Sequence, residues 1–409
     1  MSRRAFAVAA LSSLVTAGEA EAGGVGAAPL RRPRALVEMR GMWLATVSNR
    51  DWPSLPGLSA ATQRRELIAH LDRAAACGLN TVIFQVRPTA DALWPSPYEP
   101  WAECLTGVQG RNPGWDPLGT AVTEAHARGL ELHAWFNPLR IALHADPGRL
   151  VAAHPARRNP GWVVAHAGRL YYNPGLPEVR SFVRDAMLDA VRRYPVDAVH
   201  FDDYFYPYPV PGQTFDDGRA YDTYGGAFTS RAAWRRDNID RLVRDTAAGI
   251  RQVRSGTRFG ISPFGVWRNK ASDSRGSDTQ ALQAYDDLYA DTRKWVRENW
   301  IDYVCPQLYW HIGHAPADYA ELVPWWAQVA KGSGTQLYIG EALYRAGDPA
   351  QPAAWQKPAE LSRHLTLARS HAEVRGHVFF AAADVAADRV GAMKRVIADH
   401  YTGPAVPPR

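Results

Sequence analysis

Two adjacent carboxylates follow an apolar run in residues 200–207, HFDDYFYP. Removing a carboxylate from water is costly unless it has a partner, so an acid pair at the end of a buried strand needs a purpose. Side chains alternate between the two faces of a strand, which places His200, Asp202 and Tyr204 on one side. A helix N-cap or a salt bridge is the alternative role, but aromatic residues rather than a helix start follow these acids. We therefore expect Asp202 and Asp203 to be catalytic.

Hydrolysis of a glycosidic bond is the chemistry that such a pair suits, because it requires a protonated carboxyl group and a second group near the anomeric carbon. Glu341, which ends another apolar run, is the rival second carboxylate. A sugar site also needs aromatic faces for stacking and amides for binding hydroxyl groups. The candidate substrate-binding residues, which combine these types near the ends of apolar runs, are Arg40, Trp43, Arg87, Asp91, Asn137, His200, Tyr204, Tyr206, Ser262, Trp267, Gln307, Tyr309 and Trp310.

Eight short runs rich in β-branched and aromatic residues alternate with helix-like stretches in the rest of the chain. The predicted strands are residues 39–47, 81–86, 131–136, 198–204, 259–263, 303–308, 337–340 and 377–381. This alternation predicts an α/β fold, a single (β/α)8 TIM barrel, with long loops after strands 2, 3 and 4. A doubly wound open sheet is the alternative, but no G-x-G-x-x-G sequence follows the first strand. Barrel active sites lie at the carboxyl ends of the strands, where the acid pair stands.

Capping residues mark the starts of several predicted helices. Ser59 precedes the first helix, Asp116 precedes the second with proline at its first position, and Pro177 opens the third. A later stretch, residues 279–298, predicts one helix between the fifth and sixth strands.

The first 37 residues differ in composition from the rest of the chain. Arg3 and Arg4 precede an apolar run, and residues 20–22, AEA, have cleavage-site spacing. Residues 1–22 therefore predict a signal peptide of the twin-arginine kind, and the Gly-, Ala-, Pro- and Arg-rich residues 23–37 a flexible leader. No later run reaches 18 apolar residues, so we expect a periplasmic or extracellular protein without a transmembrane segment. A disordered cytoplasmic N-terminus is the alternative. The catalytic domain is assigned to residues 38–401 and a tail to 402–409.

Composition and motifs exclude several other classes of function. The net charge is +6, but the arginines alternate with acidic residues along helix-like segments, so no nucleic-acid partner is expected. The three cysteines show no CxxC spacing. The histidines show no H-x-H or H-E-x-x-H spacing, so we expect neither a metal nor another cofactor. A serine hydrolase is disfavoured because no G-x-S-x-G sequence is present.

Several motifs together resemble the bacterial glycosyl-hydrolase-like family 10, over about residues 38–400. They are RGMWL (40–44), QVRP (85–88), DALWPS (91–96), WFNP (135–138), YNPG (172–175), HFDDYFYP (200–207), ISPFGVWRN (261–269) and PQLYW (306–310). The family includes a divisome-localised hydrolase of peptidoglycan glycan strands that lack stem peptides. The resemblance implies an exported TIM-barrel glycosidase with a glycan polymer as substrate and the cell wall or division machinery as its setting. No cysteine for lipid attachment lies near the cleavage site, which leaves tethering to the membrane or the divisome open.

Two other functions stay open beside this one. The protein could hydrolyse another N-acetylhexosamine polymer, or it could be a barrel that binds glycan without cutting it. The paired acids favour an enzyme, and an N-acetyl sugar could supply its own acetamido oxygen as nucleophile. A metal-dependent polysaccharide deacetylase is a weaker rival. The order of the two acids and the oligomeric state also stay open at this stage.

Overall fold

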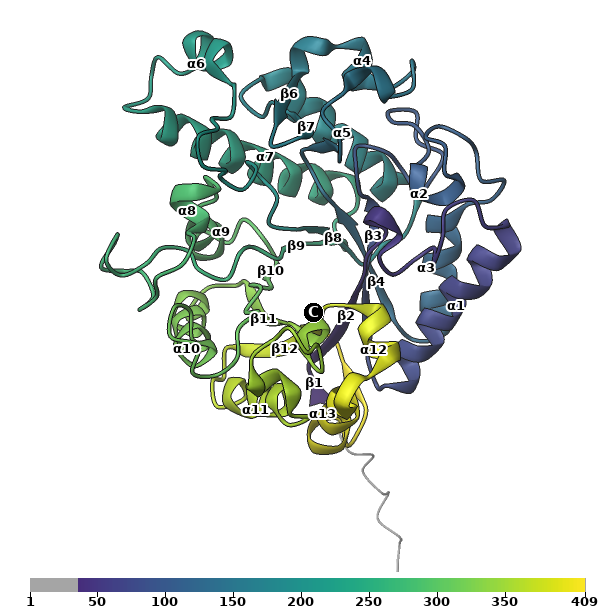
Figure 1. The fold of residues 1–409 in the computed structure, drawn as a ribbon, viewed down its shortest axis with the longest axis vertical. Coiled ribbons are helices and arrows are strands. Elements are labelled where there is room, and N and C mark those ends of the chain that lie inside the picture. Colours follow the sequence, from purple (N-terminus) through teal and green to yellow (C-terminus); the bar gives the residue numbers. More distant parts are fainter. Residues whose placement is uncertain (1–35, 409) are drawn as a thin grey trace, which may run out of the picture. The chain divides into compact units, whose positions relative to one another are not determined.

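A closed barrel of eight parallel strands forms the centre of the protein (Figure 1). The structure is a computed structural model, and it describes residues 36–408. The strands follow one another around the barrel as β2 (Met39–Leu44), β3 (Thr81–Arg87), β4 (Glu131–Phe136), β8 (Ala198–Phe201), β9 (Arg258–Ile261), β10 (Tyr303–Val304), β11 (Gln336–Glu341) and β12 (Val374–Phe379). All eight predicted strands are present in the predicted order, so the (β/α)8 barrel is confirmed.

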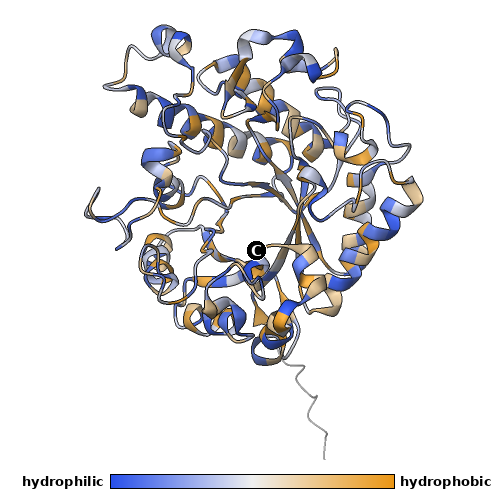
Figure 2. Ribbon diagram, viewed as in Figure 1, coloured by the Kyte–Doolittle hydropathy of each residue, from blue (hydrophilic) through white to orange (hydrophobic). Residues whose placement is uncertain are grey.

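Long helices cover the outside of the barrel, and each carries both polar and apolar residues (Figure 2). They are α1 (Ala60–Ala76), α3 (Pro117–Ala127), α5 (Pro177–Arg193), α7 (Arg231–Val253), α10 (Tyr319–Ala330), α11 (Glu360–Ala368) and α13 (Ala392–His400). The predicted caps are confirmed. The Ser59 side chain accepts a hydrogen bond from the Thr62 N–H at 3.2 Å, and Asp116 accepts one from the Gly119 N–H at 3.0 Å.

The single helix predicted for residues 279–298 is wrong. Two short helices, α8 (Ala284–Asp287) and α9 (Thr292–Arg297), stand there instead. Tyr289 lies between them with a φ of 55°, which a right-handed helix excludes. Asp291 then starts the second helix by accepting a hydrogen bond from the Lys294 N–H.

The loops that follow β3, β4 and β8 are long, and they contain elements of their own that the sequence did not predict. The loop after β3 holds α2 (Glu103–Thr106), and the loop after β8 holds α6 (Gly218–Tyr224). The loop after β4 contains α4 (Pro155–Arg158) and a small antiparallel sheet of β5 (Arg140–Ala142), β7 (Arg169–Tyr172) and β6 (Val163–His166). A further short helix, α12 (Ala382–Ala387), follows β12. These additions lie at the carboxyl ends of the strands and wall the region above the barrel.

Aromatic and polar side chains fill the barrel interior just below these carboxyl ends. The phenol of Tyr303 lies 2.9 Å from Nδ1 of both His133 and His200. Gly260 faces the Tyr303 ring so closely that a Cβ at this position would lie 2.0 Å from the ring. The interior is therefore closed, and a ligand can approach only from the rim.

The two ends of the described chain meet on the opposite side of the barrel. Strand β1 (Leu36–Val37) pairs in parallel with β13 (Ala405–Val406). These short strands belong to the predicted leader and the predicted tail, so both segments reach into the fold. The predicted signal peptide, residues 1–22, lies outside the described residues. Between residues 36 and 408, no helix has both the length and the hydropathy needed to cross a bilayer.

Candidate functional site

A cavity of about 300 Å³ opens at the carboxyl end of the barrel, and both Asp202 and Asp203 line it. The two acids follow directly after Phe201, the last residue of β8. Because the strand ends there, successive side chains no longer alternate between faces, and both carboxyl groups reach the cavity. The other predicted residues in its wall are Trp43, Tyr204, Ser262, Gln307 and Tyr309.

Asp202 is almost fully buried, with 3% of its surface exposed. Its Oδ2 atom accepts hydrogen bonds from Nε1 of Trp135 and Nδ2 of Asn137, each at 3.0 Å. Burial, together with the neighbouring charge of Asp203, raises the pKa of Asp202 to about 7. A carboxyl group with this pKa carries a proton for a large fraction of the time at neutral pH, as a general acid must.

Asp203 has a separate set of partners. The hydroxyl of Tyr208 and the Nε2 amide of Gln307, the latter at 3.0 Å, each donate a hydrogen bond to one of its carboxylate oxygens. Burial raises the pKa of Asp203, and both donors oppose that rise because they stabilise the ionised form. The two acids therefore share one cavity but accept hydrogen bonds from separate sets of donors.

Ser262 lines the cavity, and the predicted residue His200 is fully buried behind it. The Nε2 atom of His200 lies 2.8 Å from Oγ of Ser262 and accepts a hydrogen bond from Nε1 of Trp43 at 3.3 Å. Burial lowers the pKa of His200 well below its usual value, so the imidazole is neutral. His200 therefore fixes the orientation of Trp43 and Ser262 without adding a charge beneath the acids.

Arg87 binds the backbone of the loop after β4, which carries Asn137. It is fully buried, it forms an ion pair with Glu99 at 2.6 Å, and it donates to the backbone carbonyls of Asn137 and Pro138. These bonds hold the start of the loop after β4, from which the Asn137 amide reaches Asp202. Arg87 is not in the cavity wall, so its role here is to position Asn137.

Glu341 is buried away from the cavity. Its carboxylate accepts a hydrogen bond from the Tyr319 hydroxyl at 2.7 Å and lies 2.9 Å from Nδ1 of both His364 and His377. Burial opposes ionisation, but the two histidines outweigh it and lower the pKa of Glu341 to about 2. This carboxylate is held as a charged group within the barrel wall and does not approach Asp202.

Five more predicted residues also lie outside the cavity. Arg40 is at the amino-terminal end of the barrel, where it pairs with Glu38 at 3.0 Å. Tyr206 and Trp267 are buried, and the Trp267 indole donates to Asp291 at 2.9 Å. Trp310 packs against Phe264, and Asp91 lines a neighbouring hollow.

Sequence reasoning missed eight residues of the cavity wall, among them Trp135, Arg140 and Phe380. Trp135 is two residues before Asn137, so strand alternation alone could have placed its indole on the same face. Arg140 starts β5, outside the eight barrel strands, so alternation along those strands does not place it, and Phe380 follows directly after β12. Among residues 36–408, no group of three or more His, Cys, Asp or Glu side chains is arranged to hold a metal ion.

Comparison of the sequence with known proteins identifies the family of this chain. The profile of the family described as glycosyl hydrolase-like 10 matches residues 38–357. Glycosyl hydrolase YngK of Bacillus subtilis (strain 168) is 47% identical over 375 residues, which cover 91% of this chain and 73% of YngK. Glycosyl hydrolase DigH of Escherichia coli (strain K12) is 42% identical over 362 residues, which cover 84% of this chain and 82% of DigH.

Solved structures agree on the architecture. The glycoside hydrolase domain of PgaB (BpsB) from Bordetella bronchiseptica superimposes with a TM-score of 0.53 at 15% identity, covering 88% of this chain and 97% of that domain. At this identity the likeness shows the fold alone. The profile match and the two relatives, in contrast, extend over most of the sequence. The chain therefore belongs to the glycosyl hydrolase-like 10 family.

Proposed function

We propose that this protein is a glycoside hydrolase of a bacterial envelope glycan and that Asp202 and Asp203 are its catalytic pair. The observation that carries the proposal is the burial of two adjacent carboxyl groups in one cavity with different hydrogen-bond partners. Such an arrangement is costly to fold unless the site uses it. Family membership supports the same reaction type.

The geometry favours a reaction in which the substrate supplies its own nucleophile. Asp202 and Asp203 are neighbours in the chain and approach a sugar from one side, and no third carboxylate is among the residues that line the cavity. In our scheme Asp202 donates its proton to the leaving glycosidic oxygen as the bond from that oxygen to C1 breaks. The acetamido oxygen of the same sugar attacks C1, and ionised Asp203 binds the acetamido N–H. Water then opens the cyclic intermediate, and its proton returns to Asp202.

An aromatic wall faces the acid pair. Trp43, Tyr309, Tyr344 and Phe380 line the cavity, with the ring of Phe380 5.9 Å from that of Trp43 and 6.1 Å from that of Tyr309. These rings offer apolar faces against which the C–H face of a pyranose can stack. The wall would orient one sugar with its glycosidic oxygen toward Asp202.

Peptidoglycan glycan that lacks stem peptides is the substrate that we propose. The cavity volume lies at the lower limit of about 300–1,000 Å³ for small-ligand sites, so it suits a sugar without a peptide branch. The family resemblance of the motifs points to the same glycan. We further propose export through residues 1–22, which N-terminal sequencing of the mature protein would test.

Digestion of purified peptidoglycan tests the proposal. Intact glycan and glycan stripped of stem peptides by an amidase would each be incubated with the wild type, Asp202→Asn, and Asp222→Asn as a matched control. Asp222 is an exposed residue of α6 outside the cavity. We expect soluble saccharides in mass spectra only from stripped glycan, and only with the wild type and the control. Binding of glycan without release by any protein would instead indicate a non-catalytic barrel, and release from another N-acetylhexosamine polymer alone would change the substrate.

A further inference from the structure

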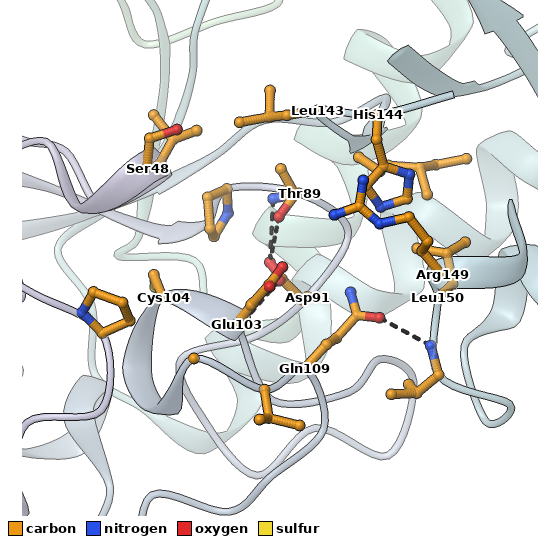
Figure 3. Close-up of a pocket in the computed structure, with 18 of the residues that line it drawn as sticks. Ser48, Thr89, Asp91, Glu103, Cys104, Gln109, Leu143, His144, Arg149 and Leu150 are labelled. Atoms are coloured by element: carbon orange, nitrogen blue, oxygen red, sulfur yellow. Dashed lines mark hydrogen bonds between the residues drawn. The ribbon is translucent and has the colours of Figure 1, made fainter. Parts of the chain in front are cut away.

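A second and larger hollow is lined by residues of the loops after β2, β3 and β4 (Figure 3). Its volume is about 620 Å³, roughly twice that of the catalytic cavity. Val47 lines both spaces. Arg140 in the wall of the first donates a hydrogen bond at 3.1 Å to the carbonyl of Pro88 in the wall of the second. The two spaces therefore lie next to each other and share part of a wall.

Two opposite charges line this hollow without pairing. Glu103 comes from α2, and Arg149 comes from the loop after β5; among residues 36–408 neither side chain forms a hydrogen bond or an ion pair with another. Figure 3 shows the Arg149 guanidinium directed into the space that Glu103 also faces. Both groups are therefore available to a ligand.

Neighbouring side chains add further polar atoms. Gln109 uses its Oε1 to accept a hydrogen bond from the Val151 N–H at 3.2 Å, and its amide nitrogen is left to donate. The imidazole of His144 also lines the hollow.

Asp91 has a structural role at the base of the hollow. It accepts hydrogen bonds from the Thr89 hydroxyl at 3.1 Å and from the Glu103 N–H at 3.2 Å. Its two carboxylate oxygens are thus already used, and they fix the loop after β3 with Glu103 at its edge. Glu103 is then the carboxylate in this hollow that has no partner.

We propose that this hollow is a second glycan subsite, which binds hydroxyl groups of the sugars that follow the cleaved residue; this inference rests on the proposed function. A hydroxyl group both donates and accepts, a carboxylate only accepts, and a guanidinium only donates. Glu103 and Arg149 can therefore bind neighbouring hydroxyls of one sugar from two sides. A purely anionic ligand would meet the charge of Glu103, and a purely cationic one that of Arg149, so a sugar chain rich in hydroxyl groups fits best, and Arg149 can also pair with a lactyl carboxylate of stripped peptidoglycan.

Binding of oligosaccharides of increasing length tests the inference. The titrations would use Asp202→Asn, which holds the glycan without cutting it, and stripped peptidoglycan fragments as the probe in calorimetry. We expect the affinity to rise with chain length. Adding Arg149→Ala or Glu103→Gln should remove about ten- to a hundred-fold of that gain, because each deletes hydrogen bonds to a charged group. Arg251→Ala, an exposed arginine of α7 outside the hollow, is the matched control.

The outcomes separate this subsite from the proposed reaction. The inference is overturned if affinity does not grow with length, or if the gain survives in both variants. Arg149 is exposed and unpaired and Glu103→Gln conserves shape, so neither change threatens folding. If the wild type releases no saccharide but the length-dependent gain is lost in the variants, the hydrolase proposal fails and the subsite stands. If stripped glycan is hydrolysed and both variants bind the oligosaccharides like the parent, the hydrolase proposal stands and the subsite fails.

Discussion

Asp202 and Glu341 are both buried carboxyl groups near the carboxyl ends of barrel strands, yet their surroundings drive them to opposite protonation states. Asp202 has neutral N–H donors and a second acid beside it, and its pKa rises to about 7. Glu341 lies between His364 and His377, and its pKa falls to about 2. Burial favours the neutral form in both places, so the partners decide the outcome. A buried carboxyl group is therefore a candidate for acid catalysis only where its neighbours allow it to gain and lose a proton near neutral pH.

The two groups also differ in what they connect. Glu341 on β11 contacts Tyr319 on α10, His364 on α11 and His377 on β12, so it ties two strands to two helices. His364 has a raised pKa despite its burial, because Glu341 and Glu360 favour its charged form. Asp202, in contrast, faces a cavity open to a ligand. We expect mutations to separate a structural carboxylate from a catalytic one.

The largest expected difference is in turnover. Asp202→Asn should lower kcat on a stripped peptidoglycan oligosaccharide by about 10²–10⁴-fold, the usual contribution of a positioned acid. Glu341→Gln should change kcat far less, because Glu341 does not reach the cavity. Kinetics with both variants, each checked for folding by circular dichroism, would measure this. Equal losses in two well-folded variants would contradict the division of roles.

In the free energy of unfolding, Glu341→Gln should lose more than Asp202→Asn. Glu341→Gln leaves two buried histidines without their carboxylate, and we expect it to lower the free energy of unfolding by about 3–5 kcal/mol at neutral pH. The pKa of Glu341 is depressed in the folded state, so its contribution is complete above about pH 4.3, the ordinary value, and is lost as the pH falls toward 2. Denaturant unfolding across this range should therefore be steeper in pH for the wild type than for Glu341→Gln. Parallel curves would show that Glu341 is not held as an ion.

Sequence patterns predicted the barrel and the acid pair but assigned Glu341 wrongly to the neighbourhood of that pair. Strand alternation carries the missing information. In β11 the inward-facing ring of Tyr338 belongs to the barrel interior, whereas Leu337 and Ile339 pack in the outer core. Glu341 shares the parity of Leu337 and Ile339, so it points toward the helices. In β2, Arg40 lies two residues before Met42 and so shares its face, and Met42 also packs in the outer core.

Other parts of the site could not be derived from the sequence. The partners of Glu341 come from three elements, and Tyr319 and His377 are 22 and 36 residues away along the chain. Arg140 lines the cavity from β5 in the loop after β4, and Phe380 does so from the position after β12; neither position belongs to one of the eight barrel strands. Such contacts depend on how loops close over the barrel, which local patterns do not encode.

The pH dependence of turnover tests how the acids influence each other. The acid must be protonated, so activity should fall as the pH rises through about 7, the pKa of Asp202. Replacing Asp203 by Asn removes the like charge that helps to raise this pKa. The descending limb of kcat for the residual activity of Asp203→Asn should therefore move to lower pH, while the limb of Asp222→Asn stays in place. A limb that moves to higher pH would assign the titrating proton to another group.

The smallest expected effect is a gain in stability when Asp202, the proposed catalytic acid, is replaced. The pKa of Asp202 is raised in the folded state, so folding becomes less favourable as the pH rises from about 4 to about 7 and this group must lose its proton. Asp202→Asn removes that penalty, and its side-chain oxygen can still accept the bonds from Trp135 and Asn137 to Oδ2. Its amide nitrogen loses the weaker bond that Oδ1 accepts from the Tyr204 N–H at 3.4 Å, which limits the gain. We expect Asp202→Asn to raise the free energy of unfolding by on the order of 1 kcal/mol at pH 8 and not at pH 4. Thermal unfolding at the two pH values measures the difference. A loss at both values would mean that Asp202, like Glu341, is held for the fold.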